Sequence, residues 1–227
     1  DLDLTANTQP AIFLISYSIF NVVKNEFNLD LNKAKYFAGH SLGEYSALSC
    51  AGYLDFSETL KILRIRGDAM QNAVPKGEGG MIAVLGSTVE NIEKILNDNK
   101  NDFIVEIAND NSNGQIVISG KNTDLNELIE ILKSNSIKNI KLPVSAPFHC
   151  ELMRSATIKM SKIIDEQNFN APNYNVVSNV TALEYESVES IKKLLIEQIE
   201  SPVRWRESIN YMISKGTNTF VEIGPGK

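Results

Sequence analysis

The sequence predicts an α/β fold in which a mostly parallel sheet is flanked by helices and carries a smaller inserted unit. Three observations support this prediction. Apolar runs of strand length alternate with longer helical patterns over most of the chain, as in sheets covered by helices on both faces. The apolar run at residues 36–38 passes through a glycine-rich turn into a helical pattern. Between residues 79 and 143, the order of elements changes to βαββαβ.

The composition is that of a globular protein. The chain has 227 residues, of which 43% are hydrophobic and 22% charged, with a net charge of −6. This charge argues against a general nucleic-acid surface, and the longest apolar stretch, residues 11–23, is too short and too polar to span a bilayer. The first residues lack the form of a secretory signal. Two cysteines, Cys50 and Cys150, cannot define a disulfide framework, which favours a reducing compartment.

The first helix is expected to begin at Thr8, whose hydroxyl can cap it, with Pro10 in the first turn. Apolar residues are so frequent from 11 to 23 that this helix is expected to be buried on most sides. Residues 24–35 form a polar connection to the first strand.

The turn that follows that strand reads Gly39-His40-Ser41-Leu42-Gly43, the G-x-S-x-G pattern of a nucleophile elbow. Both glycines are expected where a side chain would collide with neighbouring backbone. The helix after the turn places unpaired N–H groups beside Ser41, so the Leu42 amide can stabilise an oxyanion. An ordinary glycine-rich turn is the alternative, and the strand before and helix after weigh against it.

The next helix is expected to start with a capping box formed by Asp55 and Glu58. Arg66 lies in the middle of the apolar stripe of this helix, where an arginine is costly unless an anion meets it. Three interpretations stay open for Arg66: a salt bridge to an internal carboxylate, a side chain that reaches outward, and an anion-binding role. The apolar members of the stripe are Ile62, Leu63, Ala69, Met70 and Ala73.

The βαββαβ order between residues 79 and 143 is that of a ferredoxin-like subdomain. Glycine- and proline-rich hinges at 74–80 and 143–147 would connect it to a core formed by residues 1–78 and 144–227. The expected strands are 81–86, 103–108, 115–119 and 137–142, the expected helices 88–97 and 123–134, and residues 109–114 are expected to form a polar turn. After the subdomain, we expect helices at 151–166, 187–199 and 205–215, and strands at 176–180 and 219–223.

A serine nucleophile needs a general base, and histidine is the usual one. The chain has two histidines. His40 is adjacent to Ser41, so the two side chains should diverge, which leaves His149 as the candidate base. The alternative for His149 is a structural histidine at a loop-to-helix junction. Cys150 is expected to be a buried free thiol without a catalytic role.

Several segments form a common pattern along nearly the whole chain: residues 8–11, 39–48, 66–67, 114–120, 143–150, 201–205 and 222–227. In this order they resemble the malonyl-CoA:acyl carrier protein transacylases, the acyltransferases of type II fatty acid synthesis. The resemblance implies a hydrolase-like α/β core with an inserted ferredoxin-like subdomain. It also implies transfer of a malonyl group from malonyl-CoA to the phosphopantetheine thiol of acyl carrier protein.

Residue by residue, the resemblance implies that Ser41 becomes malonylated and that His149 is its base in a Ser-His dyad. Arg66 would pair with the free malonyl carboxylate, and the Leu42 N–H would be one oxyanion donor. Gln198 would orient His149 through its backbone carbonyl group. The residues implied to line the site are Gln9, His40 and Asn111.

The resemblance further implies a cytoplasmic bacterial monomer, or less readily an organellar one, without cofactor, metal, nucleic acid or membrane. Malonyl-CoA and acyl carrier protein would be its partners. The family's N-terminal Gly-Gln-Gly-Ser-Gln stretch and C-terminal helix have no counterpart here, so we expect a piece of a longer protein. The alternatives are an acyltransferase domain of a polyketide synthase, a serine esterase, and an inactive module that docks acyl carrier protein.

Overall fold

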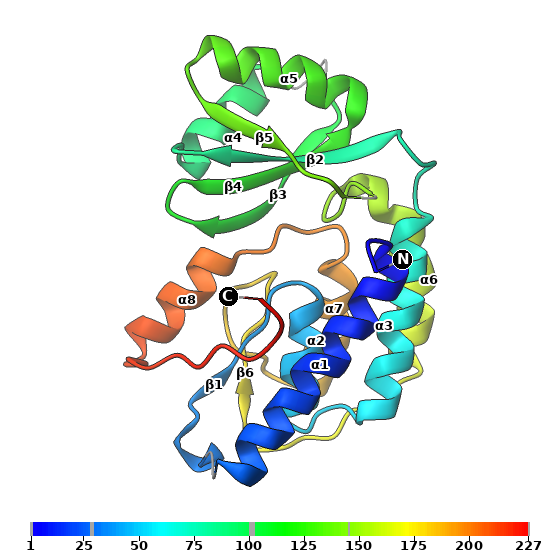
Figure 1. The fold of residues 1–227 in the computed structure, drawn as a ribbon, viewed down its shortest axis with the longest axis vertical. Helices are drawn as coiled ribbons and strands as arrows, with labels where there is room; N and C mark the ends of the chain where they lie inside the picture. The colour runs from blue at the N-terminus through cyan, green and yellow to red at the C-terminus, as the bar shows by residue number, and fades with distance from the viewer. Residues whose placement is uncertain (1, 28–29, 100–102, 145, 227) are drawn as a thin grey trace.

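A computed structural model describes residues 2–27, 30–99, 103–144 and 146–226. In Figure 1 the chain forms a larger part, below, and a four-stranded unit, above. The larger part contains α1 (Thr5–Glu26), β1 (Tyr36–Phe37), α2 (Leu42–Cys50), α3 (Phe56–Gln71), α6 (Arg154–Asp165), β6 (Asn175–Val176), α7 (Val188–Glu197) and α8 (Trp205–Ser214), with 3-10 turns at Leu31–Lys33 and Glu151–Met153. The four-stranded unit contains β2 (Gly79–Leu85), α4 (Val89–Asp98), β3 (Val105–Ser112), β4 (Gln115–Lys121), α5 (Asn122–Ser134) and β5 (Lys138–Lys141).

The sheet of the larger part consists, in the described residues, of the parallel pair β1 and β6. The strand predicted at 176–180 ends early because Asn179 turns away from the ladder: its amide and side chain bond to the segment around Ser41 instead. The strand predicted at 219–223 is wrong. These residues pair with no described strand, and Val221 is 62% exposed, so the backbone pairing that defines a strand is missing.

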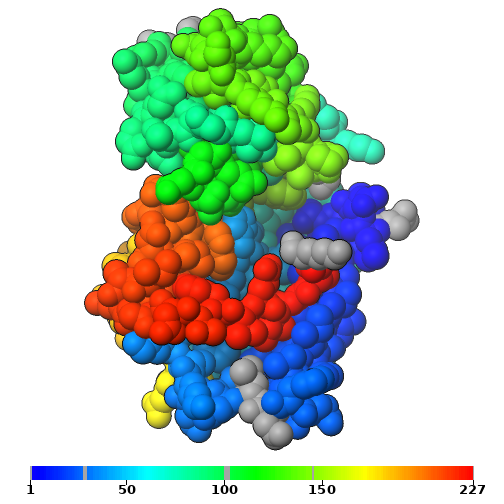
Figure 2. Space-filling model, turned by 60° about the vertical axis from the view of Figure 1, so that its left-hand side comes forward, coloured from blue at the N-terminus to red at the C-terminus, as the bar shows by residue number. Residues whose placement is uncertain are grey.

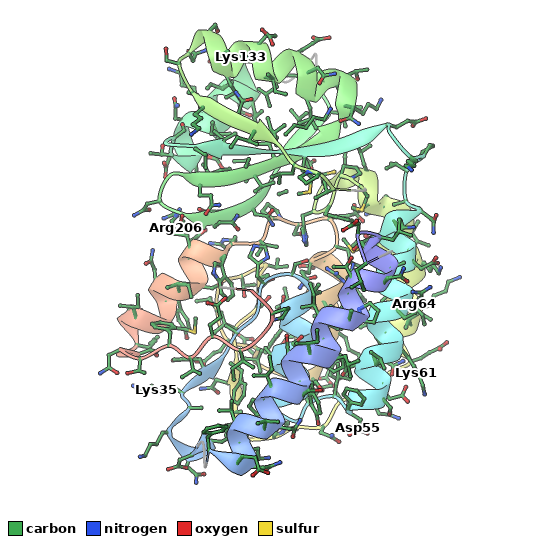
Figure 3. The ribbon with its side chains drawn as sticks, in the orientation of Figure 1. Lys35, Asp55, Lys61, Arg64, Lys133 and Arg206 are labelled. Carbon is green, nitrogen blue, oxygen red and sulfur yellow. The ribbon has the colours of Figure 1, made fainter. Side chains whose placement is uncertain are left out.

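Helix α1 begins three residues earlier than predicted, at Thr5, and Thr8 does not cap it. The Thr8 hydroxyl donates to the Leu4 carbonyl at 2.9 Å. Pro10 therefore lies inside the helix, where it cannot donate to the Ala6 carbonyl. The guanidinium of Arg64, on the neighbouring helix α3, donates to that carbonyl at 2.9 Å and so replaces the missing bond (Figure 3).

The prediction that α1 is buried on most sides is also wrong for the described part of the chain. One stripe faces α3, and residues with a 3–4 spacing lie on it. The remaining apolar residues lie outside that stripe, so several of them are exposed: Leu14, Ile15, Ile19 and Val22. Within the described ranges, none of the helices combines the length and the apolar character needed to cross a bilayer.

Helix α3 starts where predicted, after Asp55, but the capping box does not form. The Asp55 side chain makes no cap hydrogen bond, and Thr59 Oγ1 donates to the Asp55 backbone carbonyl at 2.8 Å. Its predicted stripe is buried from Ile62 to Met70, including Arg66, whereas Ala73 lies beyond the end of the helix and is half-buried. This places the guanidinium inside the protein.

The four-stranded unit has the strand order β3-β4-β2-β5 with all neighbours antiparallel, and α4 and α5 supply the apolar side chains that cover it. The predicted polar turn at 109–114 is wrong for its first four residues, because β3 continues to Ser112 and the turn consists of Asn113 and Gly114. Its polar residues are held from two sides. Asn109 and Asp110 pair with β4, and the Asp110 amide donates to the Val203 carbonyl of the larger part at 2.9 Å.

The two parts meet along this edge. The Val203 amide donates in turn to the Ala108 carbonyl at 2.8 Å. Next to this backbone pairing, Arg206 at the start of α8 forms an ion pair with Asp110 at 2.8 Å (Figure 3). The segment that leads into α8 is therefore fixed to β3 by main-chain and side-chain bonds together.

Candidate active site

Ser41 lies on a strained turn between β1 and α2. Its φ of 54° and ψ of −111° are unfavourable for a residue with a Cβ atom, and such strain is typical of functional sites. Gly39 is needed for this turn, since a Cβ there would lie 1.9 Å from the Gly43 carbonyl oxygen. The predicted collision of a side chain with neighbouring backbone is wrong for Gly43, where a Cβ would have no atom within 4 Å.

Asn179, which the sequence did not single out, holds the turn from both sides. Its Oδ1 accepts from the Ser41 amide at 2.7 Å, and its Nδ2 donates to the Gly39 carbonyl at 2.8 Å. The side chain thereby ties the backbone before Ser41 to the backbone of Ser41 itself. This supports the strained conformation.

His149 is brought to Ser41 from a distant segment. Its Nε2 lies 2.8 Å from Ser41 Oγ, and its Nδ1 lies 2.8 Å from the Gln198 backbone carbonyl. A carbonyl only accepts, so Nδ1 carries the proton and Nε2 is free to accept one. Burial lowers the pKa of His149 to about 3, and the Arg66 charge adds to this decrease. The imidazole is therefore neutral at physiological pH.

Arg66 points at the same hydroxyl. It is 1% exposed, and its Nη2 donates to Ser41 Oγ at 3.2 Å and to Gln198 Oε1 at 2.7 Å. Its Nη1 donates to Gln9 Oε1 at 2.7 Å. None of the ion pairs between described residues includes Arg66. The salt-bridge and outward-reaching interpretations are therefore both wrong.

The surroundings of Arg66 leave its charge incompletely matched. Its guanidinium lies 5.4 Å from the centre of the Tyr45 ring, and its Nε has no acceptor among the described side chains and backbone. Burial lowers the pKa of Arg66, but a guanidinium stays protonated in proteins. A buried cation held by neutral oxygens beside Ser41 favours an anion at this point of the site.

Glu44, in the first turn of α2, is a site residue that sequence reasoning missed. It is fully buried, and its carboxylate accepts from Gln198 Nε2 at 2.5 Å, from the Asn179 amide at 3.3 Å and from the Tyr185 hydroxyl. Burial raises the pKa of Glu44 to about 7, against the effect of these hydrogen bonds and of Arg66. Its only local signal in the sequence is its place in the first turn of a helix. Acidic residues are common there because they interact favourably with the helix dipole.

The other predicted residues surround this group. Gln9 is buried and also donates to Thr5 Oγ1 at 3.0 Å. His40 points toward the four-stranded unit, where its Nε2 lies 2.8 Å from Asn111 Oδ1, so it diverges from Ser41 as predicted. At the start of α2, the amides of Gly43 and Glu44 donate to His40 and Ser41 carbonyls, whereas no hydrogen bond described for the chain uses the Leu42 amide.

Six buried or half-buried side chains thus converge, and we refer to them as the polar cluster: Gln9, Ser41, Glu44, Arg66, His149 and Gln198. Figure 2 shows the surface hollowed between the four-stranded unit and the red C-terminal segment. The described residues contain no group of histidine, cysteine or acidic side chains that could hold a metal ion. The predicted free thiols are present: Cys150 is buried, and burial raises its pKa to about 11.

A serine on a strained strand-to-helix turn, hydrogen-bonded to a neutral buried histidine, defines the class of enzymes that carry acyl groups on serine. Comparison with known proteins agrees with this class. The sequence matches the acyl transferase domain over residues 1–226. The malonyl CoA-acyl carrier protein transacylase of Bacillus subtilis strain 168 is 42% identical over 229 residues, which cover 100% of this chain and 71% of that protein.

Solved structures agree with the sequence comparison. An acyl-carrier-protein-S-malonyltransferase from Bartonella henselae superposes with a TM-score of 0.94 at 41% identity, over 99% of this chain and 72% of that one. A type II PKS acyl-carrier protein in complex with its malonyl-transacylase gives 0.92 at 36% identity, over 99% and 72%. The chain therefore belongs to the acyl transferase family of malonyl CoA-acyl carrier protein transacylases, which confirms the resemblance and the α/β fold class.

Proposed function

We propose that this chain transfers a malonyl group from malonyl-CoA to the phosphopantetheine thiol of acyl carrier protein, through a malonyl ester on Ser41. The observation that carries the proposal is the Arg66 guanidinium, which is buried, forms no ion pair with any described carboxylate, and has its Nη2 3.2 Å from Ser41 Oγ. A malonyl group on Ser41 has a free carboxylate, and a guanidinium can bind it through two parallel hydrogen bonds. An acetyl group offers no such partner.

In the first half-reaction, Ser41 Oγ attacks the thioester carbonyl carbon while His149 Nε2 takes the hydroxyl proton. The Leu42 amide, at the N-terminus of α2, would stabilise the oxyanion that forms. When the carbon–sulfur bond breaks, the proton on His149 passes to the leaving sulfur, and coenzyme A departs as a thiol. The malonyl group remains on Ser41 as an ester.

In the second half-reaction, the phosphopantetheine thiol attacks the ester carbonyl carbon and gives its proton to His149. The carbon–oxygen bond to Ser41 breaks, and His149 returns the proton to the serine oxygen. Both steps need an imidazole that is neutral and correctly oriented. The backbone carbonyl of Gln198, 2.8 Å from His149 Nδ1, supplies the orientation, and no carboxylate is needed for it.

Arg66 would decide the substrate. When the acyl group has no carboxylate, the guanidinium stays buried with neutral acceptors, the side chains of Gln9, Gln198 and Ser41. Breaking a buried ion pair costs about 3–5 kcal/mol, which corresponds to two or more decades in rate. This argues for a carboxylate-bearing substrate and against a general serine esterase.

The test is intact-mass measurement after mixing the protein with malonyl-CoA. We expect a mass increase of one malonyl group in the parent protein and none in Ser41→Ala. Ser49→Ala is the matched control, since it removes a buried serine hydroxyl from α2, the helix that Ser41 precedes, and should leave the adduct unchanged. An adduct that persists in Ser41→Ala would overturn the proposal. Release of free malonate at the same rate with and without carrier protein would favour the esterase.

The remaining expectations are part of this proposal. The complex of a carrier protein with its malonyl-transacylase supports acyl carrier protein as the acceptor. We further propose a monomer in the bacterial cytoplasm, in keeping with the bacterial sources of the relatives, and a reaction without a cofactor. The division into a core of residues 1–78 and 144–227 and an inserted subdomain at 79–143 stays a prediction, which the separate sheet between Gly79 and Lys141 supports.

A further inference from the structure

The mechanism above leaves one buried charge without a role, the carboxylate of Glu44. It is fully buried, and a hydrogen-bonded path connects it to Arg66 through one side-chain amide. Gln198 Nε2 donates to Glu44 Oε2 at 2.5 Å, and Gln198 Oε1 accepts from Arg66 Nη2 at 2.7 Å. The amide therefore stands between the two opposite charges of the site.

The chemistry of these groups fixes the amide in one orientation. A carboxylate only accepts hydrogen bonds and a guanidinium only donates them, so the amide nitrogen must face Glu44 and the oxygen must face Arg66. The Ser41 carbonyl accepts from the same nitrogen at 3.0 Å. In this arrangement Glu44 balances part of the Arg66 charge without touching it, and leaves Nη2 directed at Ser41.

From this geometry we infer that Glu44 sets how strongly Arg66 attracts the acyl carboxylate, and that a proton taken up by Glu44 strengthens this attraction. The inference rests on the proposed function and identifies a residue that tunes its specificity. An acyl carboxylate at Arg66 competes with Glu44 for the same positive charge. Coupling between two sites is reciprocal, so neutralising Glu44 favours the acyl carboxylate, and a bound carboxylate favours protonation of Glu44.

The pH range follows from the surroundings of the carboxylate. The charged and titratable groups that face Glu44 are Tyr45 on its own helix, Arg66 on α3 and Tyr185 ahead of α7. Burial raises the pKa of Glu44 to about 7, whereas the pKa of Tyr45 rises to about 12 and that of Tyr185 well above its ordinary value. Between pH 6 and 8, Glu44 is therefore the member of this group that changes charge.

The experiment compares kcat/KM for acyl-serine formation from malonyl-CoA and from acetyl-CoA at pH 6 and pH 8. The ratio of the two values removes effects on His149 and on the coenzyme A phosphates, which both substrates share. In the parent protein we expect the malonyl-to-acetyl ratio to rise about threefold to tenfold as the pH falls from 8 to 6, mainly through a lower KM for malonyl-CoA. In Glu44→Gln, which is isosteric and neutral, the ratio should be high and independent of pH.

Two further variants keep the inference testable if Glu44→Gln does not fold. Tyr185→Phe removes a hydrogen bond that lowers the pKa of Glu44, so the rise in the ratio should occur at higher pH. Glu58→Gln is the matched control: it neutralises an exposed carboxylate in the first turn of α3 and should behave as the parent.

A ratio that does not depend on pH in the parent, or that varies with pH equally in Glu44→Gln, would overturn the inference. A lower ratio in Glu44→Gln would do so as well, since it would mean that the carboxylate positions Arg66 and does not compete for it. In each of these results the parent protein still forms the malonyl ester on Ser41, so only the inference about Glu44 fails. If the parent protein forms no malonyl ester at all, the proposed function fails instead.

Discussion

The four-stranded unit and the polar cluster are built on opposite principles. Behind the sheet, the buried side chains of the unit are aliphatic: Ile82, Val84, Ile92, Ile116, Ile118, Leu125, Leu128 and Leu132. In the polar cluster, a buried arginine, glutamate and histidine contact one another through an amide and a serine hydroxyl. Ser41 and His149 also have positive φ angles, of 54° and 59°.

The difference indicates that the four-stranded unit stabilises the fold, whereas the polar cluster lowers the stability of the fold. Local propensity, apolar pattern and packing agree in most of the four-stranded unit, except in the polar end of β3 and in β5, and such agreement is the condition for a sequence to specify one structure. The polar cluster violates the same rules with desolvated charges and strained backbone, and such violations are typical of functional sites. Substitutions in the two regions should therefore separate stability from activity.

The largest expected effect is the loss of selectivity in Arg66→Ala. Removing the guanidinium leaves an acyl carboxylate without its partner, which costs about 3–5 kcal/mol and lowers the malonyl-to-acetyl ratio of kcat/KM by at least two decades. Loading of an acetyl group should continue. The measurement is acyl-serine formation with each thioester, and equal losses for both substrates would contradict the assigned role.

In the four-stranded unit, Leu128→Ala should have the opposite profile. Leu128 is fully buried among aliphatic side chains, so its truncation should lower the free energy of unfolding by about 2–5 kcal/mol. The malonyl-to-acetyl ratio of the folded protein should stay within twofold of the parent. Urea unfolding gives the first quantity and acyl-serine formation the second; a changed ratio would mean that the two regions are not independent.

Glu44→Gln tests the cost of the buried carboxylate. The pKa of Glu44 rises from 4.5 to about 7 on folding, so the folded state binds more protons than the unfolded state between these values. Stability from this group is therefore complete below pH 4.5 and is lost as the pH rises through 7, by on the order of 3 kcal/mol.

The measurement is urea unfolding of the parent and of Glu44→Gln at pH 4.5, 6 and 7.5. The stability of the variant relative to the parent should increase over this range, because the variant has no carboxyl group to deprotonate. Comparing the two proteins at each pH cancels the contribution of His149, whose lowered pKa acts in the opposite direction. A constant difference would show that Glu44 does not titrate in this range.

The smallest expected effect is at Gly43. A methyl group there meets no atom within 4 Å, so Gly43→Ala should change the free energy of unfolding by less than about 1 kcal/mol, in the stabilising direction. Gly39→Ala is the contrasting variant, since its methyl group would lie 1.9 Å from the Gly43 carbonyl oxygen and the turn cannot keep its shape. Thermal unfolding of both variants measures the difference, and similar melting temperatures would contradict it.

The contrast between the four-stranded unit and the polar cluster also explains which features could be predicted from the sequence. The βαββαβ order could be predicted because β2, β4, α4 and α5 carry clear apolar patterns, whereas β5 and the second half of β3 are largely polar. The turn around Ser41 was found because its glycines and serine are adjacent. His149 could be selected only because the chain has two histidines.

Other features depend on contacts between distant segments and have no local signal. Glu44 and Asn179 are 135 residues apart, and each also fits an ordinary local explanation. The exposed side of α1 could not be told from its buried side, because every position from 11 to 15 is apolar. The unformed strand at 219–223 has a suitable composition, and only the lack of a described neighbour distinguishes it from a real one.

The pairing of Val203 with β3 has a consequence for substitutions along this junction. Two main-chain hydrogen bonds, to Ala108 and from Asp110, join the four-stranded unit to the segment that leads into α8. Main-chain bonds do not depend on which side chain a residue carries, so this backbone junction does not rely on the identity of Val203 or Ala108. Substitutions on the surrounding surface should therefore leave the four-stranded unit and the segment before α8 joined as they are.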